Sequence, residues 1–152
     1  TDIVVFLDAD YSDYPQDLPA MVKPIVNDKA EMVIGSRMSG KSEKGALLPQ
    51  AVFGNKLATL LIRLFWGFKY TDLGPFRTIK YKDLLSLNMV DKNFGWTVEM
   101  QIKALKKGLR IMEVPVRYRK RIGKSKITGT FSGTVRAGVK IIYTIFKYGF
   151  LK

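Results

Sequence analysis

The sequence feature that most constrains the fold is an apolar run that ends in acid. Residues 3–7 read Ile-Val-Val-Phe-Leu, and Asp8-Ala9-Asp10 follow directly. A continuous run rich in β-branched residues is typical of a strand buried on both faces of a sheet. The run therefore predicts an α/β fold. It also places two carboxylates at the carboxyl end of a buried strand, where α/β sheets bind ligands.

The rest of the chain alternates between strand and helix patterns. We expect strands at 2–7, 31–34, 76–79 and 110–118, and helices at 18–27, 47–66, 82–87, 97–107 and 135–150. Pro24 should end or kink the first helix, and Gly108 should cap the helix at 97–107. This order predicts an α/β layer with a mixed, mostly parallel sheet flanked by helices.

The composition excludes several kinds of chemistry. The chain has 152 residues, about one domain, and contains neither Cys nor His. It therefore has no thiol nucleophile, no disulfide, and neither the usual zinc ligands nor the commonest general base. No apolar run reaches the roughly 18 residues of a membrane-spanning helix. Because the chain starts at a strand without an initiator Met, we expect it to be part of a longer protein.

The basic charge is concentrated in the last quarter of the chain. Residues 114–152 carry ten Lys or Arg and no acid, whereas the net charge of residues 1–113 is +3. Such a cluster predicts a polyanionic partner, which could be phosphates, nucleic acid or an anionic membrane. We do not expect nucleic acid, because aromatic residues are not interleaved with the basic ones as stacking platforms.

Asp8 and Asp10 have two interpretations. Side chains two residues apart on an extended chain point the same way, and two close carboxylates repel unless a cation lies between them. Magnesium or manganese would bridge such carboxylates to the phosphates of a ligand. Alternatively, these acids form turns and start helices, which we consider the better explanation for Asp13 and Asp17.

The segment 114–130 predicts a phosphate-binding loop. Extended backbone would place its arginines on one face, opposite Val116 and Tyr118, and Gly123 would let the backbone approach a ligand closely. The cationic and hydroxyl side chains expected on the loop include Arg117, Arg119, Arg121, Lys124 and Ser125. The alternative is a solvated basic surface loop.

Six motifs occur in an order that resembles a known family. They are FLDADYSDYPQDLP, MVIGSR, the pair Gly54-Asn55, DLGPFR, GWTVEMQIKALKKGLRIMEVPVRYR and GKSKI. Together they resemble the second half of a family-two glycosyltransferase, in the branch of dolichyl-phosphate mannose synthases and bacterial polyprenyl-phosphate sugar transferases. The resemblance implies the C-terminal portion of a GT-A nucleotide-diphospho-sugar transferase fold at residues 1–130. Residues 131–152 would form a basic amphipathic, membrane-proximal helix.

The resemblance also implies roles for individual residues. Asp8 and Asp10 would hold Mg²⁺ or Mn²⁺ on the diphosphate of a nucleotide-sugar donor, with Asp10 the firmer ligand and Gln16 nearby. The residues implied on the sugar and acceptor side are Arg37, Asp72, Arg77 and Trp96. Those implied to bind phosphates are Arg117, Arg121, Lys124 and Ser125. The family's N-terminal half, which reads the nucleotide base, is absent from this chain.

Glu99 leaves two mechanisms open. It falls near the family's catalytic base, but the usual Glu-Asp pair is Glu99-Met100 here. A sugar or protein hydroxyl acceptor would need Glu99 as base, whereas a lipid phosphate is already largely ionised and needs none. Alternatively, Glu99 only pairs with Lys103 on its helix. Trp96 is equally explained as a core or sugar-wall residue, and Asn55 as a helix-start residue.

These features favour an inverting, metal-dependent transferase that moves a sugar from a nucleotide-diphosphate sugar to polyprenyl phosphate. It would act at the cytoplasmic face of a membrane, peripherally or anchored by other segments. The basic final helix fits that location, although an ordinary core-docked helix would also explain it. One alternative is a soluble polysaccharide-forming transferase of the same family that uses Glu99 as base. The other is a non-catalytic basic module that binds membrane or nucleic acid.

Overall fold

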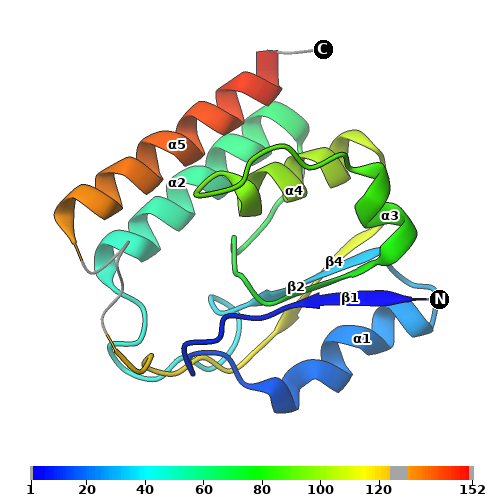
Figure 1. The fold of residues 1–152 in the computed structure, drawn as a ribbon, viewed down its shortest axis with the longest axis horizontal. Helices are drawn as coiled ribbons and strands as arrows, with labels where there is room; N and C mark the ends of the chain where they lie inside the picture. Colours follow the sequence, from blue (N-terminus) through cyan, green and yellow to red (C-terminus); the bar gives the residue numbers. More distant parts are fainter. Residues whose placement is uncertain (1, 124–129, 151–152) are drawn as a thin grey trace.

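Four strands form one mixed sheet in the computed structural model, which describes residues 2–123 and 130–150 (Figure 1). In sheet order the strands are β1 (Ile3–Phe6), β3 (Arg77–Lys80), β2 (Met32–Ser36) and β4 (Ile111–Pro115). β2 and β4 are parallel, with Met32 opposite Ile111. β3 is antiparallel to both β1 and β2, with Ile79 opposite Val4 and Met32. The expected α/β class and the mixed sheet are therefore confirmed.

The parallel share of the sheet is smaller than the alternation of strands and helices predicted. Among the strands of residues 2–123, one pairing is parallel and two are antiparallel. A parallel pairing requires the connecting helix to carry the chain back to the end of the sheet at which the previous strand began. Instead, the segment after α2 (Pro49–Trp66) brings the chain back to the edge where β2 ends, and Gly35 N–H donates to the carbonyl of Phe76 at 2.8 Å. β3 must then run against β2.

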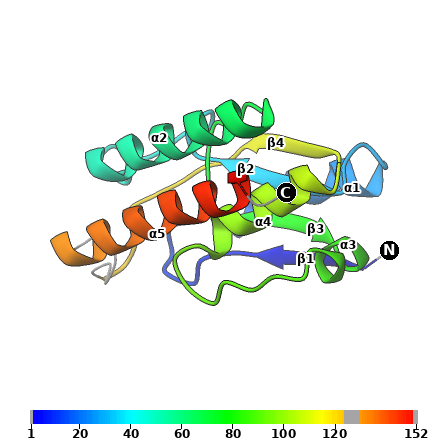
Figure 2. The same ribbon diagram turned by 90° about the horizontal axis from the view of Figure 1, so that it is seen from above.

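Helices cover both faces of the sheet (Figures 1 and 2). One face carries α1 (Leu18–Val26), which follows the 3₁₀ turn η1 (Pro15–Asp17). The other carries α2, α4 (Trp96–Lys106) and α5 (Phe131–Phe150), and the short α3 (Tyr81–Ser86) follows β3. Alternation along β2 serves both layers, because Met32 and Ile34 join the α2–α4–α5 core while Val33 joins the α1 core.

The helix and strand boundaries lie close to those predicted, with exceptions at prolines. α1 continues through Pro24 and ends two residues later. β4 ends at Pro115, short of the predicted 118, because Pro has no N–H to give to the ladder. Gly108 follows α4 in the left-handed conformation, φ 68°, as expected of a helix C-terminus. No helix in the described ranges has the length and apolar character to cross a membrane.

α2 and α5 lie side by side and run in the same direction (Figures 1 and 2). Near their C-terminal ends the Phe65 ring meets the edges of Phe146 and Phe150, at centroid distances of 5.6 and 5.5 Å. A Cβ on Gly149 would lie 2.7 Å from the Phe65 ring, so a larger residue here would displace that ring. The two helices are therefore closely packed at this end.

Candidate active site

Asp10 lies just past β1, where the chain turns through Tyr11 at a left-handed φ of 74°. One carboxylate oxygen of Asp10 accepts from both the backbone N–H (3.0 Å) and the hydroxyl of Ser12. The other lies 3.0 Å from the Arg121 guanidinium. Although partial burial opposes it, the Ser12 hydrogen bonds and the Arg121 charge hold the pKa of Asp10 below its usual value. Asp10 is therefore ionised and faces a cation.

Two further acids crowd this strand end. The backbone N–H of Asp8 donates to Asp13 at 3.1 Å, and the other Asp13 carboxylate oxygen is buried without a partner. Burial, with the charges of Asp8 and Asp10, raises the pKa of Asp13 to about 6. Burial and the Asp10 charge likewise raise the pKa of Asp8. The charges of Asp8 and Asp10 thus act on each other, as expected, and Asp13 joins them although the sequence suggested only a turn residue there.

The donor set at this strand end suits a divalent ion that a ligand helps to hold. No group of three or more acids in the described ranges has the arrangement of a complete metal site. Mg²⁺ and its relatives, however, commonly use one or two carboxylates together with substrate phosphates and waters. Asp8 and Asp10 meet that requirement, and a cation would offset both the burial and the Asp10 charge that raise the pKa of Asp8.

The basic segment after β4 lies against this strand end. Val116 and Tyr118 are buried, as expected for the face opposite the arginines. Arg117 binds Asp17 through its side chain (2.9 Å) and its backbone N–H (2.8 Å). Asp17 therefore does more than start a helix: it occupies the N-cap position of α1, makes no capping hydrogen bond there, and holds the basic segment instead.

Two more arginines of this segment contact the chain just after β1. Arg119 stacks over the rings of Tyr11 and Tyr14, at 3.2 and 4.3 Å from their centroids. Arg121 is the residue that binds Asp10, so the basic segment and the acidic strand end form one site. Lys124 and Ser125, both implied to bind phosphate, lie outside the described residues. Gln16 lies exposed in η1.

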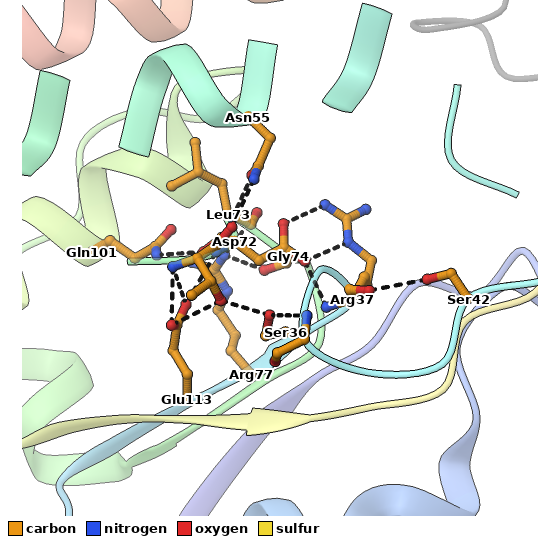
Figure 3. A network of polar contacts seen from close by, with 12 residues as sticks. Ser36, Arg37, Ser42, Asn55, Asp72, Leu73, Gly74, Arg77, Gln101 and Glu113 are labelled. Carbon is orange, nitrogen blue, oxygen red and sulfur yellow. Dashed lines mark hydrogen bonds and ion pairs between the residues drawn. The ribbon is translucent and has the colours of Figure 1, made fainter. Parts of the chain in front are cut away.

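A second aspartate–arginine pair lies beside the end of β2 (Figure 3). Asp72 is fully buried and binds the Arg37 guanidinium through two parallel contacts, both 2.8 Å. The backbone N–H of Arg37 also donates to Asp72 at 2.8 Å. Burial opposes the charge, but the Asp72 hydrogen bonds and charge outweigh it and raise the pKa of Arg37. This pair fixes the segment after β2 against the 71–74 turn.

Three side chains that the sequence analysis missed or undervalued hold the 71–74 turn (Figure 3). Asn55, buried in the middle of α2 rather than at its start, donates to the Thr71 carbonyl (2.9 Å) and accepts from Leu73 N–H (2.8 Å). Glu113 accepts the backbone N–H groups of Thr71 and Asp72 at 2.9 and 3.1 Å. Gln101 donates to the Asp72 carbonyl at 3.1 Å. The one available signal was an acid inside an apolar strand, Glu113 in β4.

Arg77 is fully buried beneath the same turn. It donates to the carbonyls of Thr97 (2.9 Å) and Gly74, and its guanidinium lies over the ring of Trp96. Burial lowers its pKa to about 10. A guanidinium with no exposed surface is out of reach of a ligand, so this geometry favours a positioning role over substrate contact. Trp96 itself packs edge-on against Phe6 at 4.8 Å.

Glu99 is buried in α4 and fully engaged. It accepts from the backbone N–H groups of Val90 and Asp91, from the Tyr148 hydroxyl, and from Lys103 at 2.7 Å. Burial opposes ionisation, but these donors together lower its pKa. The pairing with Lys103 is present, although buried rather than on the surface. The geometry favours the structural alternative for Glu99, and the catalytic one stays a prediction.

A family model described as glycosyl transferase family 2 matches residues 1–85. The chain belongs to this family, as its motifs predicted. An undecaprenyl-phosphate mannosyltransferase of Micrococcus luteus is 29% identical over 87% of this chain and 56% of its own length. A UDP-N-acetylglucosamine–dolichyl-phosphate N-acetylglucosaminyltransferase of Methanococcus voltae is 35% identical over 76% of this chain and 47% of its own.

The fold also matches a solved glycosyltransferase. Glucosyl-3-phosphoglycerate synthase from Mycobacterium tuberculosis, in complex with Mn²⁺, UDP-glucose and phosphoglyceric acid, aligns with a TM-score of 0.66 at 20% identity. The alignment covers 97% of this chain and 49% of that one. The expected GT-A fold is thereby confirmed. The chain spans about half the length of the curated relatives it matches.

Proposed function

We propose that the protein containing this chain is an inverting glycosyltransferase that moves a sugar from a nucleotide-diphosphate sugar to a polyprenyl phosphate. The observation that carries the proposal is the contact of Asp10 with Arg121. It joins an acidic strand end, suited to a divalent ion, to a basic segment suited to phosphates. A diphosphate needs both kinds of partner, because the ion and the arginines can neutralise its oxygens from two sides.

Asp8 and Asp10 would hold the divalent ion, Mg²⁺ or Mn²⁺, on the donor diphosphate. The ion would supply electrostatic stabilisation for the negative charge that develops on the departing nucleoside diphosphate. Arg121 lies within reach of the same charge, and Arg117 is held on the same segment by Asp17. The solved structure similar in fold contains Mn²⁺ with UDP-glucose, which supports a metal-bound nucleotide sugar.

A lipid phosphate is the acceptor that this chain's residues suit best. A phosphate monoester is largely ionised near pH 7, so its oxygen can attack the anomeric carbon while the bond to the diphosphate breaks. No proton has to move. This fits Glu99, whose carboxylate is already occupied by four donors and is poorly placed to act as base. Two relatives are named as transferases that act on undecaprenyl phosphate and dolichyl phosphate, and these names support the same choice.

The membrane location is part of the proposal. A lipid phosphate presents its head group at a bilayer surface, here the cytoplasmic one. α5 carries Arg136, Lys140 and Lys147 together with exposed apolar residues such as Val139 and Phe150, the composition of a helix that lies on an anionic bilayer.

The first test uses membranes from cells that express the full-length protein, supplied with Mn²⁺ and labelled nucleotide sugars. Transfer into an organic-extractable lipid is compared for wild type, Asp10→Ala and Glu99→Gln. We expect Asp10→Ala to lower transfer by about 100–1000-fold, as the loss of one charge-stabilising group does. Glu99→Gln should keep most of the transfer. Asp2→Ala, an exposed acid just before the other end of β1, is the matched control.

The outcomes separate the alternatives. Label that stays in water-soluble polymer and is lost with Glu99→Gln would replace the proposal with the polysaccharide-forming transferase. No metal-dependent transfer of any sugar would leave the non-catalytic basic module as the better account. That module would not need Asp8 or Asp10, and its binding would weaken steeply with salt.

A further inference from the structure

Tyr11 has an unfavourable backbone conformation directly after Asp10. Its φ is 74°, in the left-handed region, and its side chain is 52% exposed. Left-handed backbone is rare for a residue with a bulky side chain, and such strain persists only where the surrounding contacts impose it. Because the Tyr11 ring is not part of the core, contacts other than core packing must hold this turn.

Arg119 supplies those contacts. Its Nε donates to the Tyr11 carbonyl, and its guanidinium lies over the Tyr11 ring, 3.2 Å from the centroid. The same guanidinium lies 4.3 Å from the centroid of Tyr14. The backbone N–H of Arg119 also donates to the Ser12 carbonyl at 3.0 Å. A planar guanidinium can stack on a ring and donate a hydrogen bond from its edge at the same time, so one residue holds most of the turn.

Backbone pairing fixes the place of Arg119 over the turn. The residue before it, Tyr118, forms an antiparallel bridge with Asp13 and a parallel bridge with the segment after β2. Further along, the N–H of Ile122 donates to the Asp10 carbonyl at 2.9 Å. The basic segment is thus paired with the turn on both sides of Arg119, and its register does not depend on that side chain.

The three arginines of the basic segment have different partners. Arg117 pairs with Asp17 at 2.6 Å, and Arg121 pairs with Asp10 at 3.0 Å. Arg119 forms no salt bridge with an acid in the described part of the chain; its partners are two rings and a carbonyl. The sequence analysis expected all three as cations for phosphates. The geometry gives Arg119 a different task, because its contacts fix the shape of the chain beside an acid.

We propose that Arg119 is a positioning residue that holds Tyr11 in the left-handed conformation and thereby sets the direction of the Asp10 carboxylate. In that direction one carboxylate oxygen accepts from Ser12 and the other lies beside Arg121. If the turn relaxed, this carboxylate would turn away from the place where it is proposed to hold the divalent ion. The inference rests on the proposed function and adds to it the residue that orients the metal ligand.

Arg119→Lys separates positioning from phosphate binding. Lysine keeps the positive charge but lacks the planar group and the Nε donor. Binding of Mn²⁺ alone to the full-length enzyme is measured from the EPR signal of the free ion. We expect Arg119→Lys and Arg119→Gln each to weaken it about tenfold, as loss of a group that orients a metal ligand does. Arg63→Lys, at an exposed position of α2, is the control that leaves it unchanged. Wild-type Mn²⁺ affinity in Arg119→Lys overturns the inference.

Substitutions of Tyr11 test the role of the strained backbone. Tyr11→Ala and Tyr11→Gly both remove the ring, but only glycine adopts a positive φ without cost. We expect Tyr11→Ala to bind Mn²⁺ about fivefold more weakly than Tyr11→Gly, the factor that corresponds to the left-handed penalty of an alanine. In the Tyr11→Gly background, Arg119→Lys should weaken Mn²⁺ binding no more than about twofold, because little strain is left to hold. Equal affinities of the Ala and Gly variants overturn the inference.

Kinetics and stability exclude two other roles for Arg119. At saturating Mn²⁺, Arg119→Lys should lower kcat for lipid-directed transfer about tenfold and change KM for the nucleotide sugar by less than about threefold. A raised KM with unchanged kcat would instead identify a phosphate ligand. Thermal unfolding is measured for every variant. Losses of Mn²⁺ affinity that follow the loss of thermal stability across the series would mean a merely structural residue.

The two hypotheses fail in different ways. If wild type transfers sugar to lipid phosphate but the Arg119 and Tyr11 variants bind Mn²⁺ as wild type does, the positioning role is wrong and the proposed function stands. If wild type binds Mn²⁺ but transfers no sugar to any lipid phosphate, the proposed function is wrong, and the variants still decide whether Arg119 orients the metal ligand. A wild type that binds no Mn²⁺ overturns both.

Discussion

Two aspartate–arginine pairs differ in their burial and in the number of contacts that join them. One is Asp72 with Arg37, and the other is Asp10 with Arg121. Their closest contacts are 2.8 and 3.0 Å. The Asp72 side chain is fully buried and receives three hydrogen bonds from Arg37, two of them in parallel. The Asp10 side chain is 25% exposed and contacts Arg121 through a single ion pair.

The comparison separates a pair that stabilises the fold from an exchangeable pair, whose two members can take other partners. Breaking a buried, bidentate pair leaves a charge that water cannot reach, so Asp72 and Arg37 must stay together. A partly exposed pair gains little from its contact, because water and salt replace it readily. Asp10 and Arg121 can therefore part without unfolding the site, as the proposed binding of a metal and a phosphate requires.

The largest effect is expected at the buried pair. Asp72→Asn should lower the free energy of unfolding by roughly 3–5 kcal/mol, because it leaves the Arg37 charge uncompensated. Urea unfolding followed by tryptophan fluorescence measures the change. Asp28→Asn is the matched control, since Asp28 also pairs with basic residues but is 74% exposed, and it should cost at most about 1 kcal/mol. Equal losses for the two variants would contradict the contrast between buried and exposed pairs.

Asp13 sharpens the comparison as a buried acid with no cation partner among the described side chains. Its pKa, raised from 3.8 to about 6, means that the folded state holds the proton more tightly than the unfolded state. The contribution of Asp13 to the free energy of unfolding, seen as the difference between wild type and Asp13→Asn, should therefore fall by roughly 2 kcal/mol as pH rises from about 4 to about 6. Unfolding in EDTA across this range measures the slope. Asp13→Asn should change the slope by this amount, and the same slope in both proteins would rule out a contribution from Asp13.

Glu99 tests whether a carboxylate that accepts from four donors stabilises the fold rather than taking part in catalysis. Glu99→Gln should destabilise the fold by about 2 kcal/mol, since it weakens charge-assisted hydrogen bonds to buried donors. Thermal or urea unfolding is compared with lipid-directed transfer at a temperature where both proteins are folded. Unaltered stability together with lost transfer would instead identify Glu99 as the catalytic base.

The smallest effect is expected at the exchangeable pair. A double-mutant cycle with Asp10→Asn and Arg121→Gln should give a coupling energy in stability below about 1 kcal/mol, because both side chains are partly exposed. The same cycle on Asp72 and Arg37 should give several times more. Similar values for the two cycles would mean that Asp10 and Arg121 are as firmly joined as the buried pair.

Most of the fold could be predicted from the sequence, because buried strands and amphipathic helices leave periodic patterns. The expected strand at 31–34 and helix at 97–107 lie within two residues of β2 and α4. The direction of β3 could not be predicted in this way. It depends on where the segment between α2 and β3 returns to the sheet, and no local pattern records that path.

The candidate site was only partly predictable, for a related reason. Asp8 and Asp10 stand next to each other in a motif, and Arg121 lies in a visible basic run. The clamp around the 71–74 turn depends on Asn55, Gln101 and Glu113, which come from α2, α4 and β4. Their function is to satisfy backbone groups of a distant turn, so only the folded arrangement shows it.

The aromatic contact between Phe65 and the end of α5 joins α2 and α5 firmly at one end. Because an atom added at Gly149 would push against the Phe65 ring, this end of the two helices is held at a close separation. Toward their other end, Gly54 and Gly138 line an open apolar groove between the same helices. Any rotation about the packed end would change the separation of the helices most at the open end, so the contact at the rings would control a width some distance away.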